Sequence, residues 1–243
     1  MSTAPAPATS PIPGFHCPST PDPVPPAPLR AAPDGIALQE PVEAGAAELL
    51  RSALPEPGRG ELDALRARLA RRAHDDGLLD VAYRTIDSPH GRLLLAVAPA
   101  GLVRVAFESE GLEAVLDELA RSVSPRLLEA ASPTDGAARQ LDEYFEGRRR
   151  AFDLPIDLRL VRGFRREVVE HLRTIPYGST RSYSEVARGA GRPTAVRAAG
   201  SACATNPIPI VVPCHRVVRS DGTVGQYLGG APMKSALLAL ESA

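Results

Sequence analysis

The chain has 243 residues, a formal net charge of −1 and 44% hydrophobic residues, which is enough apolar material for a folded core. Only 4% of the residues are aromatic and Trp is absent, so an aliphatic core is expected. The three cysteines, Cys17, Cys203 and Cys214, are too few for a disulfide framework, which favours a reducing, cytoplasmic location. No apolar run is long enough for a membrane span and MSTAPAPATS lacks signal-peptide features, so no membrane partner is expected.

Residues 1–60 contain 14 of the 25 prolines and are otherwise rich in Ala, Gly and Ser. A segment of this composition buries too little apolar surface to offset its conformational entropy, so a disordered, partly polyproline extension is predicted. His16 and Cys17 lie in this extension, but two ligands are too few for a metal site, and no metal is expected.

Residues 61–77 carry Leu62, Leu65 and Leu69 at helical spacing, with Arg on the opposite face. This pattern predicts a short amphipathic helix over 61–75 that ends by Gly77. A helix that packs on the next domain and a helix or linker that packs weakly both fit the pattern.

Residues 78–158 change to short apolar runs followed by helical periodicity. Three strands are predicted over 81–86, 92–97 and 101–107, with a turn-rich loop over 88–91 between the first two. Two helices are predicted over 112–122 and 135–146. This segment therefore predicts an α+β domain with a small, mostly antiparallel sheet.

Residues 159–243 predict an α-helical domain with helices over 164–174, 182–190, 194–204 and 234–241. Ser182 and Glu185 have the spacing of a capping box at the start of the second helix. Two short helices around the turn Gly191-Arg-Pro193 are typical of a winged helix-turn-helix-like DNA-binding domain.

Charge divides unevenly between these two domains. Residues 78–158 hold nine basic and 14 acidic groups, a net charge of −5, whereas residues 159–243 hold 12 basic and five acidic groups, a net charge of +7. A cation-rich helix-turn-helix favours binding to the phosphate backbone of DNA. An electrostatic contact with the acidic domain is the alternative explanation.

The strongest chemical signal is the segment from Asn206 to Val218, NPIPIVVPCHRVV. Its apolar run, 208–212, is expected to be buried, with Cys214 presented at its end after a proline. A lone Cys is most often an inert buried residue, and Cys203 is interpreted as one because no reactive neighbours accompany it.

Several neighbours favour a reactive thiol at Cys214. His215 and Arg216 are expected to favour the thiolate, and Glu241 is available to orient the imidazole. A thiol, a base and an orienting carboxylate make up an activated nucleophile. The glycine-rich loop over 222–230 would let a planar ligand approach the backbone closely.

The stretch IPIVVPCHRVV, with Asn eight residues before the Cys and VGQYLGG after it, closely resembles the O6-alkylguanine-DNA alkyltransferases, also called methylated-DNA–protein-cysteine methyltransferases. The resemblance covers residues 78–243 and implies a ribonuclease-like domain over 78–158 and a catalytic, DNA-binding domain over 159–243. It implies a DNA-repair protein that flips a damaged base out of the duplex. The alkyl group on O6 of guanine, or O4 of thymine, would then move irreversibly to the cysteine in a single turnover.

The resemblance implies a catalytic role for each matching residue. Cys214 is the acceptor, His215 deprotonates it through a water, and Glu241 orients that imidazole. Asn206 ties the helix-turn-helix to the active-site strand, and Tyr183 assists guanine as the leaving group.

The remaining matching residues line the pocket or contact DNA. Arg197 takes the space of the extruded base, while Tyr227 and Lys234 line the pocket, with Lys234 counted among the catalytic residues. The carbonyl of Val217, with that of the acceptor cysteine, accepts from the guanine amino group, and the amide of Leu228 faces O6.

The resemblance implies no cofactor and one partner, double-stranded DNA containing O6-alkylguanine, bound through the minor groove. The protein is expected to act as a monomer with no obligate protein partner. Ala204 stands where some relatives carry a basic residue and Leu228 where some carry Ser, which leaves the substrate range open. The four-Cys zinc site of the adaptive-response relatives has no counterpart, which argues against a transcriptional activator.

Three other functions compete with alkyl transfer. A non-catalytic lesion binder of the alkyltransferase-like kind lacks the acceptor cysteine, so the presence of Cys214 argues against it. A transcription regulator needs a dimerisation element, for which residues 61–75 are too short. A cysteine hydrolase needs multiple turnovers on an ester or amide, which an assay would decide.

Overall fold

The computed structural model describes residues 58–242. Most of the extension predicted over residues 1–60 therefore lies outside the described residues, and residues 59 and 60 already belong to a helix. Within the described range, no helix is long and apolar enough to span a bilayer.

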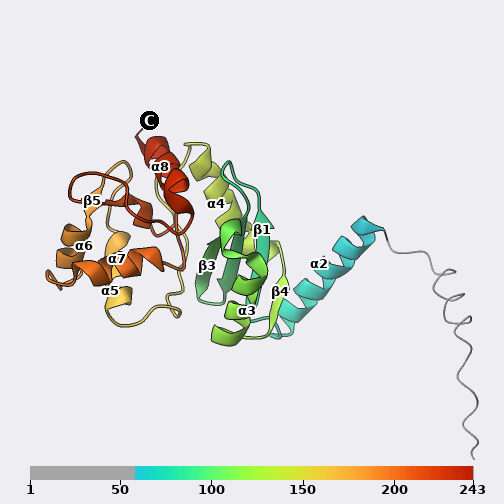
Figure 1. Ribbon diagram of the computed structural model, residues 1–243. Helices are drawn as coiled ribbons and strands as arrows, with labels where there is room; N and C mark the ends of the chain where they lie inside the picture. The colour runs from blue at the N-terminus through green and yellow to red at the C-terminus, as the bar shows by residue number, and fades with distance from the viewer. Residues whose placement is uncertain (1–57, 243) are drawn as a thin grey trace, which may run out of the picture. The chain divides into compact units, whose positions relative to one another are not determined.

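Helix α2 (Arg59–Asp75) is the short helix predicted ahead of the sheet, and it lies beside strand β4 (Leu127–Glu129) (Figure 1). The leucines of its periodic pattern are exposed, with 38% of Leu62 and 59% of Leu69 accessible to solvent. Its buried contact is made instead by small residues in its last turns, Ala70 and Ala73, against Leu79, Ala82 and Ala130. Only the end of the helix packs on the domain.

The first domain is built on a four-stranded sheet with the order β3-β2-β1-β4. Its three long strands match the predicted ones within one residue: β1 (Val81–Ile86), β2 (Leu93–Ala98) and β3 (Gly101–Phe107). These three are antiparallel to one another, whereas the short strand β4, which no sequence pattern indicated, runs parallel to β1.

Both faces of the sheet are covered, which explains why β2 and β3 are apolar almost throughout. One face packs on α3 (Leu112–Ser122) through Val115 and Leu119. The other face packs on α4 (Asp135–Phe145) through Ala138, Leu141 and Tyr144, and on the second domain. One face of the sheet therefore contributes both to the core of its own domain and to the domain junction.

The second domain is helical, as predicted. Its elements are α5 (Phe164–Leu172), β5 (Arg181–Ser182), α6 (Tyr183–Gly189), α7 (Val196–Ala204), β6 (Val217–Val218) and α8 (Gly230–Glu241). The predicted capping box is present, because the Ser182 side chain accepts from the Glu185 amide and Glu185 accepts from the Ser182 amide. Helices α6 and α7 pack on each other and on α5, and a short parallel β5–β6 pair lies beside them.

Residues 208–212 are buried as predicted, but they form turns rather than the strand that the resemblance implied. The Val212 amide donates to the Ile208 carbonyl at 2.9 Å, and Ile210 has a φ of 73°. Prolines precede, interrupt and follow this run and lack the N–H groups of a strand ladder, so the chain turns instead.

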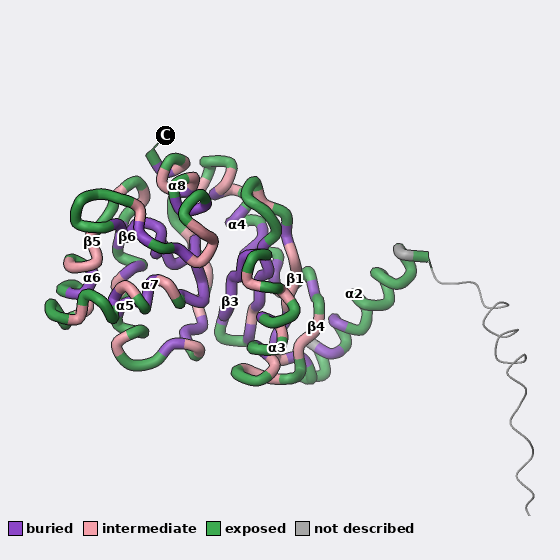
Figure 2. Tube along the Cα trace, viewed as in Figure 1, coloured by how far each residue is buried: buried purple, intermediate pink, exposed green. Residues whose placement is uncertain are grey.

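The two domains share one continuous hydrophobic core. The Val105 amide of β3 donates to the Pro207 carbonyl at 2.9 Å, so the segment leading to Cys214 lies against the edge of the sheet. Figure 2 shows buried backbone in the sheet and in the segment beside it. The first domain therefore supports the segment that carries the chemistry.

Candidate active site

Cys214 begins a single 3₁₀ turn directly after Pro213 and is 1% exposed. The Asn206 side-chain amide donates to the Cys214 Sγ atom at 3.1 Å and to the Val212 carbonyl at 2.9 Å. The amide oxygen of the same side chain accepts from the Ile208 amide at 3.1 Å. Asn206 therefore closes the 206–214 turn and contacts the thiol directly.

The thiol is protonated in this environment at neutral pH. Burial raises the pKa of Cys214 to about 11, while the Asn206 hydrogen bond and the nearby Lys234 charge act in the opposite direction. The expectation that Arg216 favours the thiolate is wrong, because its guanidinium turns to Glu241 instead. The buried thiol therefore needs a base to take its proton.

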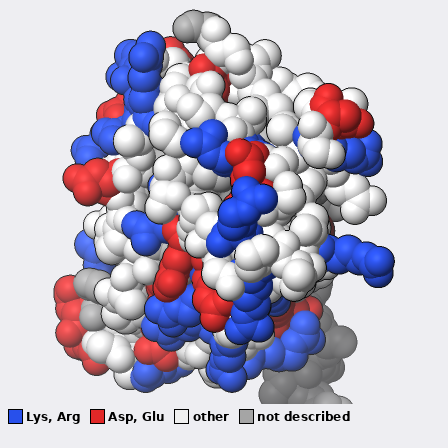
Figure 3. Space-filling view, turned by 90° about the vertical axis from the view of Figure 1, so that its left-hand side faces the viewer, with Lys and Arg blue, Asp and Glu red and all other residues white. Residues whose placement is uncertain are grey.

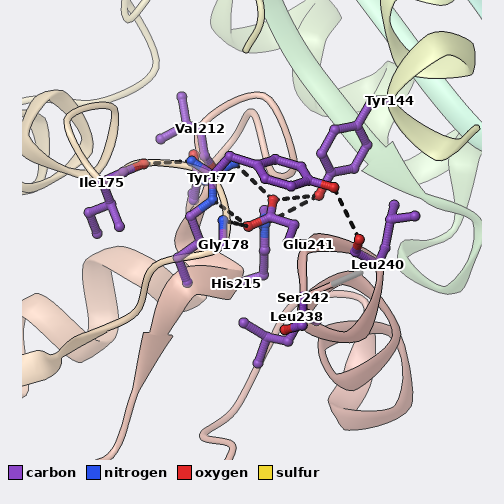
Figure 4. A network of polar contacts seen from close by, with 12 residues as sticks. Tyr144, Ile175, Tyr177, Gly178, Val212, His215, Leu238, Leu240, Glu241 and Ser242 are labelled. Carbon is purple, nitrogen blue, oxygen red and sulfur yellow. Dashed lines mark hydrogen bonds and ion pairs between the residues drawn. The ribbon is translucent and has the colours of Figure 1, made fainter. Parts of the chain in front are cut away.

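That base is part of a buried polar network centred on Glu241 (Figure 4). The Glu241 Oε1 atom lies 2.9 Å from His215 Nε2 and accepts from the Tyr144 hydroxyl at 2.7 Å. Arg216 donates from Nε to Oε2 and from Nη2 to Oε1, both at 2.8 Å. The Gly178 amide donates to Oε2 at 3.2 Å.

The protonation states of this network follow from its partners. Burial by itself would raise the pKa of Glu241, but hydrogen bonds from His215, Arg216 and Tyr144 outweigh it and lower the pKa to about 2. Burial lowers the pKa of His215, so the imidazole is neutral at pH 7. A carboxylate only accepts hydrogen bonds, which assigns the proton to Nε2 of His215 and leaves Nδ1 as an acceptor. Nδ1 is buried and has no hydrogen-bond partner among residues 58–242.

Glu241 is 5% exposed although it lies two residues from the C-terminus. The last turn of α8 is held in place because the Tyr177 hydroxyl donates to the Leu240 carbonyl at 3.0 Å. Arg216 also donates to the Ile175 carbonyl at 2.5 Å, which joins this turn to the segment after α5. Sequence reasoning did not assign Tyr144, Arg216 or Tyr177 to this network, and no spacing in the chain links a tyrosine at position 144 to the C-terminus.

Tyr183 and Lys234 also lie near the thiol. Lys234 is fully buried, donates from Nζ to the Val217 carbonyl, and lies 5.8 Å from the centre of the Tyr183 ring. Burial lowers the pKa of Lys234 and raises the pKa of Tyr183, which the two nearby cysteines raise further. The Val217 carbonyl implied as a guanine acceptor is thus already bonded to Lys234, which leaves one lone pair for a ligand.

The glycine-rich loop before α8 lies close to these side chains. A Cβ atom at Gly225 would collide with the Tyr183 hydroxyl, so this glycine permits a close approach. Tyr227 is buried, with its ring 5.6 Å from that of Phe107 and 6.4 Å from that of His215, and its hydroxyl has no partner in the described residues. Leu228 is half-buried at the edge of the core.

Arg197 stands apart from this cluster because it is exposed on α7. Nine of the ten predicted site residues are therefore buried or half-buried, whereas Arg197 lies on the surface. Figure 3 shows the side of the molecule that carries α5 and α6, where arginine side chains are numerous and interspersed with acidic ones. The exposed arginines of the helix-turn-helix and the adjoining strands are Arg181, Arg188, Arg192, Arg197 and Arg219.

Cys203 is buried on α7 in the shared core, in agreement with its interpretation as a packing residue. Burial raises its pKa far above the ordinary value, so it is not an activated thiol. In residues 58–242, no group of three or more His, Cys, Asp and Glu side chains is arranged to hold a metal ion.

Comparison with known proteins finds matches to both domains. Residues 81–158 match the family described as 6-O-methylguanine DNA methyltransferase, ribonuclease-like domain, and residues 163–243 match its DNA-binding domain. A methylated-DNA–protein-cysteine methyltransferase of Mycolicibacterium paratuberculosis is 43% identical over 161 residues, which cover 66% of this chain and 92% of that protein. One from Methanosarcina barkeri is 39% identical over 159 residues, which cover 65% of this chain and 96% of that protein.

Solved structures give the same result. The O6-methylguanine methyltransferase of Mycobacterium tuberculosis is similar with a TM-score of 0.58 and 41% identity, covering 67% of this chain and 93% of that one. A structure of the M. tuberculosis protein in complex with DNA has a TM-score of 0.56 at 41% identity, covering 66% of this chain and 92% of that one.

Proposed function

Because the chain belongs to the methylated-DNA–protein-cysteine methyltransferase family, we propose that it repairs DNA by moving an alkyl group from O6 of guanine to the Cys214 sulfur. The observation that carries this proposal is a buried thiol bonded to Asn206 and adjoining a buried His215–Glu241 pair. The substrate is double-stranded DNA, and O4-alkylthymine is a second substrate of the same chemistry.

The first step is removal of the thiol proton by His215. Its Nε2–H is held by the Glu241 carboxylate, so Nδ1 is the atom that can accept the proton, through one water molecule. Glu241 stabilises the imidazolium that forms, and Asn206 and Lys234 stabilise the thiolate. Tyr144 and Arg216 keep the carboxylate in its orientation.

The second step is an in-line displacement at the alkyl carbon. The thiolate sulfur forms a bond to that carbon while the bond from the carbon to O6 breaks, and the electron pair of that bond goes to the guanine. Tyr183 donates a proton or hydrogen bond to the departing base, and the Leu228 amide faces O6. Burial keeps the Tyr183 hydroxyl protonated, as a donor must be.

The product is a thioether at Cys214, and the site offers no route to cleave it. A thioether carbon is a weak electrophile, and a thiolate bound to carbon is a poor leaving group for attack by water. Each molecule therefore acts once, without a cofactor.

Access to O6 requires that the nucleotide leave the base stack. We propose that α7 enters the minor groove and that Arg197 occupies the space left by the flipped base. Small residues make up most of this helix, which allows a close approach with one long side chain projecting. The exposed arginines around the helix-turn-helix neutralise backbone phosphates, and the protein acts as a monomer.

The deciding experiment is intact-mass measurement after mixing with a duplex that contains one O6-methylguanine. The expected result is the gain of one methyl group per protein molecule, mapped to Cys214, with no further turnover. Cys214→Ser should bind the duplex but gain no methyl group, whereas Cys203→Ala is the matched control and should react like the wild type. Methylation of Cys214→Ser at the wild-type rate would show that another cysteine is the acceptor.

A further inference from the structure

Arg104 occupies an unusual place for a charged side chain. It lies on β3 in the first domain, is 7% exposed, and stands between two fully buried valines, Val103 and Val105. Its Nη2 atom pairs with Glu110 Oε2 at 2.5 Å, and Nη1 donates to the Val105 carbonyl at 3.2 Å and to the Pro207 carbonyl at 3.3 Å. A buried ion pair contributes little net stability, whereas its hydrogen bonds can fix the geometry of the groups around it.

Pro207 is the residue next to Asn206, the amide that bonds to the Cys214 sulfur. Its carbonyl receives two donors from the first domain, the Val105 amide at 2.9 Å and the Arg104 guanidinium. Two converging donors fix both the position and the direction of that carbonyl, and hence the backbone from which the Asn206 side chain projects.

The turn that follows requires such support. Ile210 is fully buried with a φ of 73°, a left-handed conformation that β-branched residues rarely adopt. A residue in this conformation persists only when its surroundings determine it. The supports of this turn are the internal Asn206 bonds and the attachment of Pro207 to β3.

Glu110 also connects this ion pair to Tyr227, which lies in the loop that follows Cys214 in the chain. Its Oε1 atom accepts from the Phe107 amide at 2.8 Å, and the Phe107 ring packs edge-on against the Tyr227 ring. The Tyr227 ring in turn contacts the His215 ring at a centroid distance of 6.4 Å. One buried ion pair in the first domain therefore supports both the turn before the thiol and the loop after it.

We propose that the Arg104–Glu110 pair is a positioning device for the alkyl transfer, which acts through Pro207 to hold the Asn206 amide against the Cys214 sulfur. This inference rests on the proposed function. It gives the sheet of the first domain a part in the reaction, beside the contact that Tyr144 of α4 makes with Glu241.

The test is the double variant Arg104→Met/Glu110→Gln, which removes the ion pair without leaving an unpaired buried charge and keeps an acceptor for the Phe107 amide. Transfer from an O6-methylguanine duplex and from free O6-methylguanine should both slow by about tenfold or more, because the loss concerns the thiol and not DNA. Arg92→Met is the matched control, since Arg92 forms an exposed pair with Glu108 on the same sheet and does not reach Pro207. The control should transfer at the wild-type rate.

A second measurement distinguishes a loss of the Asn206 position beside the thiol from a general loosening of the fold. The pH dependence of Cys214 alkylation by iodoacetamide, followed by peptide mass mapping, gives the pKa of the thiol. Loss of the Asn206 donor should raise this pKa, whereas entry of water into a loosened core would lower it toward the ordinary value. In an Asn206→Ala background the double variant should cause no further rise.

An unchanged or lowered thiol pKa together with an unchanged transfer rate would overturn the proposal. If the double variant fails to fold, Arg104→Lys serves instead, because it keeps a charge for Glu110 but cannot donate to Pro207 in the same geometry. Should the wild-type protein accept no methyl group, the proposed function fails, yet the iodoacetamide titration still decides whether Arg104 acts on the thiol.

Discussion

Replacement of Glu241 by Gln removes the only acidic group among the described partners of Arg216. The expected loss in the free energy of unfolding can be obtained in two ways. The first uses the pKa of Glu241, which is lowered from 4.5 to about 2. This difference corresponds to about 3 kcal/mol of stability that the carboxylate contributes when ionised. The second uses the partner, because removing one member of a buried ion pair costs about 3–5 kcal/mol through the charge left behind. Glu241→Gln is therefore expected to lower the free energy of unfolding by about 3 kcal/mol or more.

The sign of the pH dependence follows from the lowered pKa. The contribution of Glu241 is fully present above pH 4.5, the pKa of the unfolded carboxyl, and is lost as the pH falls toward 2. The free energy of unfolding of the wild type should therefore decrease over this range through Glu241, and that part of the decrease should be absent in Glu241→Gln. The variant should also transfer methyl groups far more slowly, because His215 loses the carboxylate that holds its Nε2–H.

The assay is urea unfolding at pH 7 and at several values down to pH 3, followed by circular dichroism. The matched variant Glu241→Gln/Arg216→Met removes both charges and should recover part of the lost stability without recovering transfer. A loss below about 1 kcal/mol at pH 7, with the pH dependence of the wild type retained, would show that the Glu241 carboxylate is not a buried, paired anion.

Three further predictions concern other parts of the molecule. Arg197→Ala should slow repair of a duplex by about tenfold or more while leaving reaction with free O6-methylguanine unchanged, since a free base has no stack to leave. Equal losses of rate on both substrates would mean that Arg197 acts in the binding pocket or stabilises the fold. Tyr144→Phe removes one hydrogen bond to Glu241 and should cost about 1–2 kcal/mol in urea unfolding, together with a few-fold slower transfer; no change in either measurement would remove Tyr144 from the network. A chain without residues 1–57 should transfer within a few-fold of the full-length rate, because the Pro-rich composition predicts no packed contact; a loss of about 100-fold would contradict that composition argument.

Local patterns were sufficient for the three long strands, for the start of α6 and for the reactive segment, but not for the short strand β4. The period-two and apolar runs place β1 to β3 within one residue, and the capping pair at Ser182 and Glu185 marks the start of α6. These elements are predictable because their signals come from neighbours in the chain, within the reach of one turn or one strand. The segment around Cys214 is equally local, since thiol, imidazole and the amide of Asn206 lie within ten residues of one another.

The leucines of α2 show where periodicity alone misleads. Their spacing indicates a buried stripe, yet they are exposed and the helix packs through Ala70 and Ala73. A pattern identifies which residues share a face, but it does not say whether a partner surface of matching shape exists for that face. The contact is made where Ala70 and Ala73 meet Leu79, Ala82 and Ala130, which lie outside the helix in the chain.

Sequence patterns alone identify the groups available for chemistry: a thiol with an adjacent imidazole in the basic domain, a helix-turn-helix rich in arginine and a carboxylate at position 241. The electrostatic state of these groups depends on the tertiary structure. The fold turns Arg216 away from the thiol and onto Glu241, adds Tyr144 from 97 residues away, and buries the whole network. Hydrogen-bond partners and burial set a pKa, and both depend on which distant segments meet in the core, which no spacing along the chain encodes.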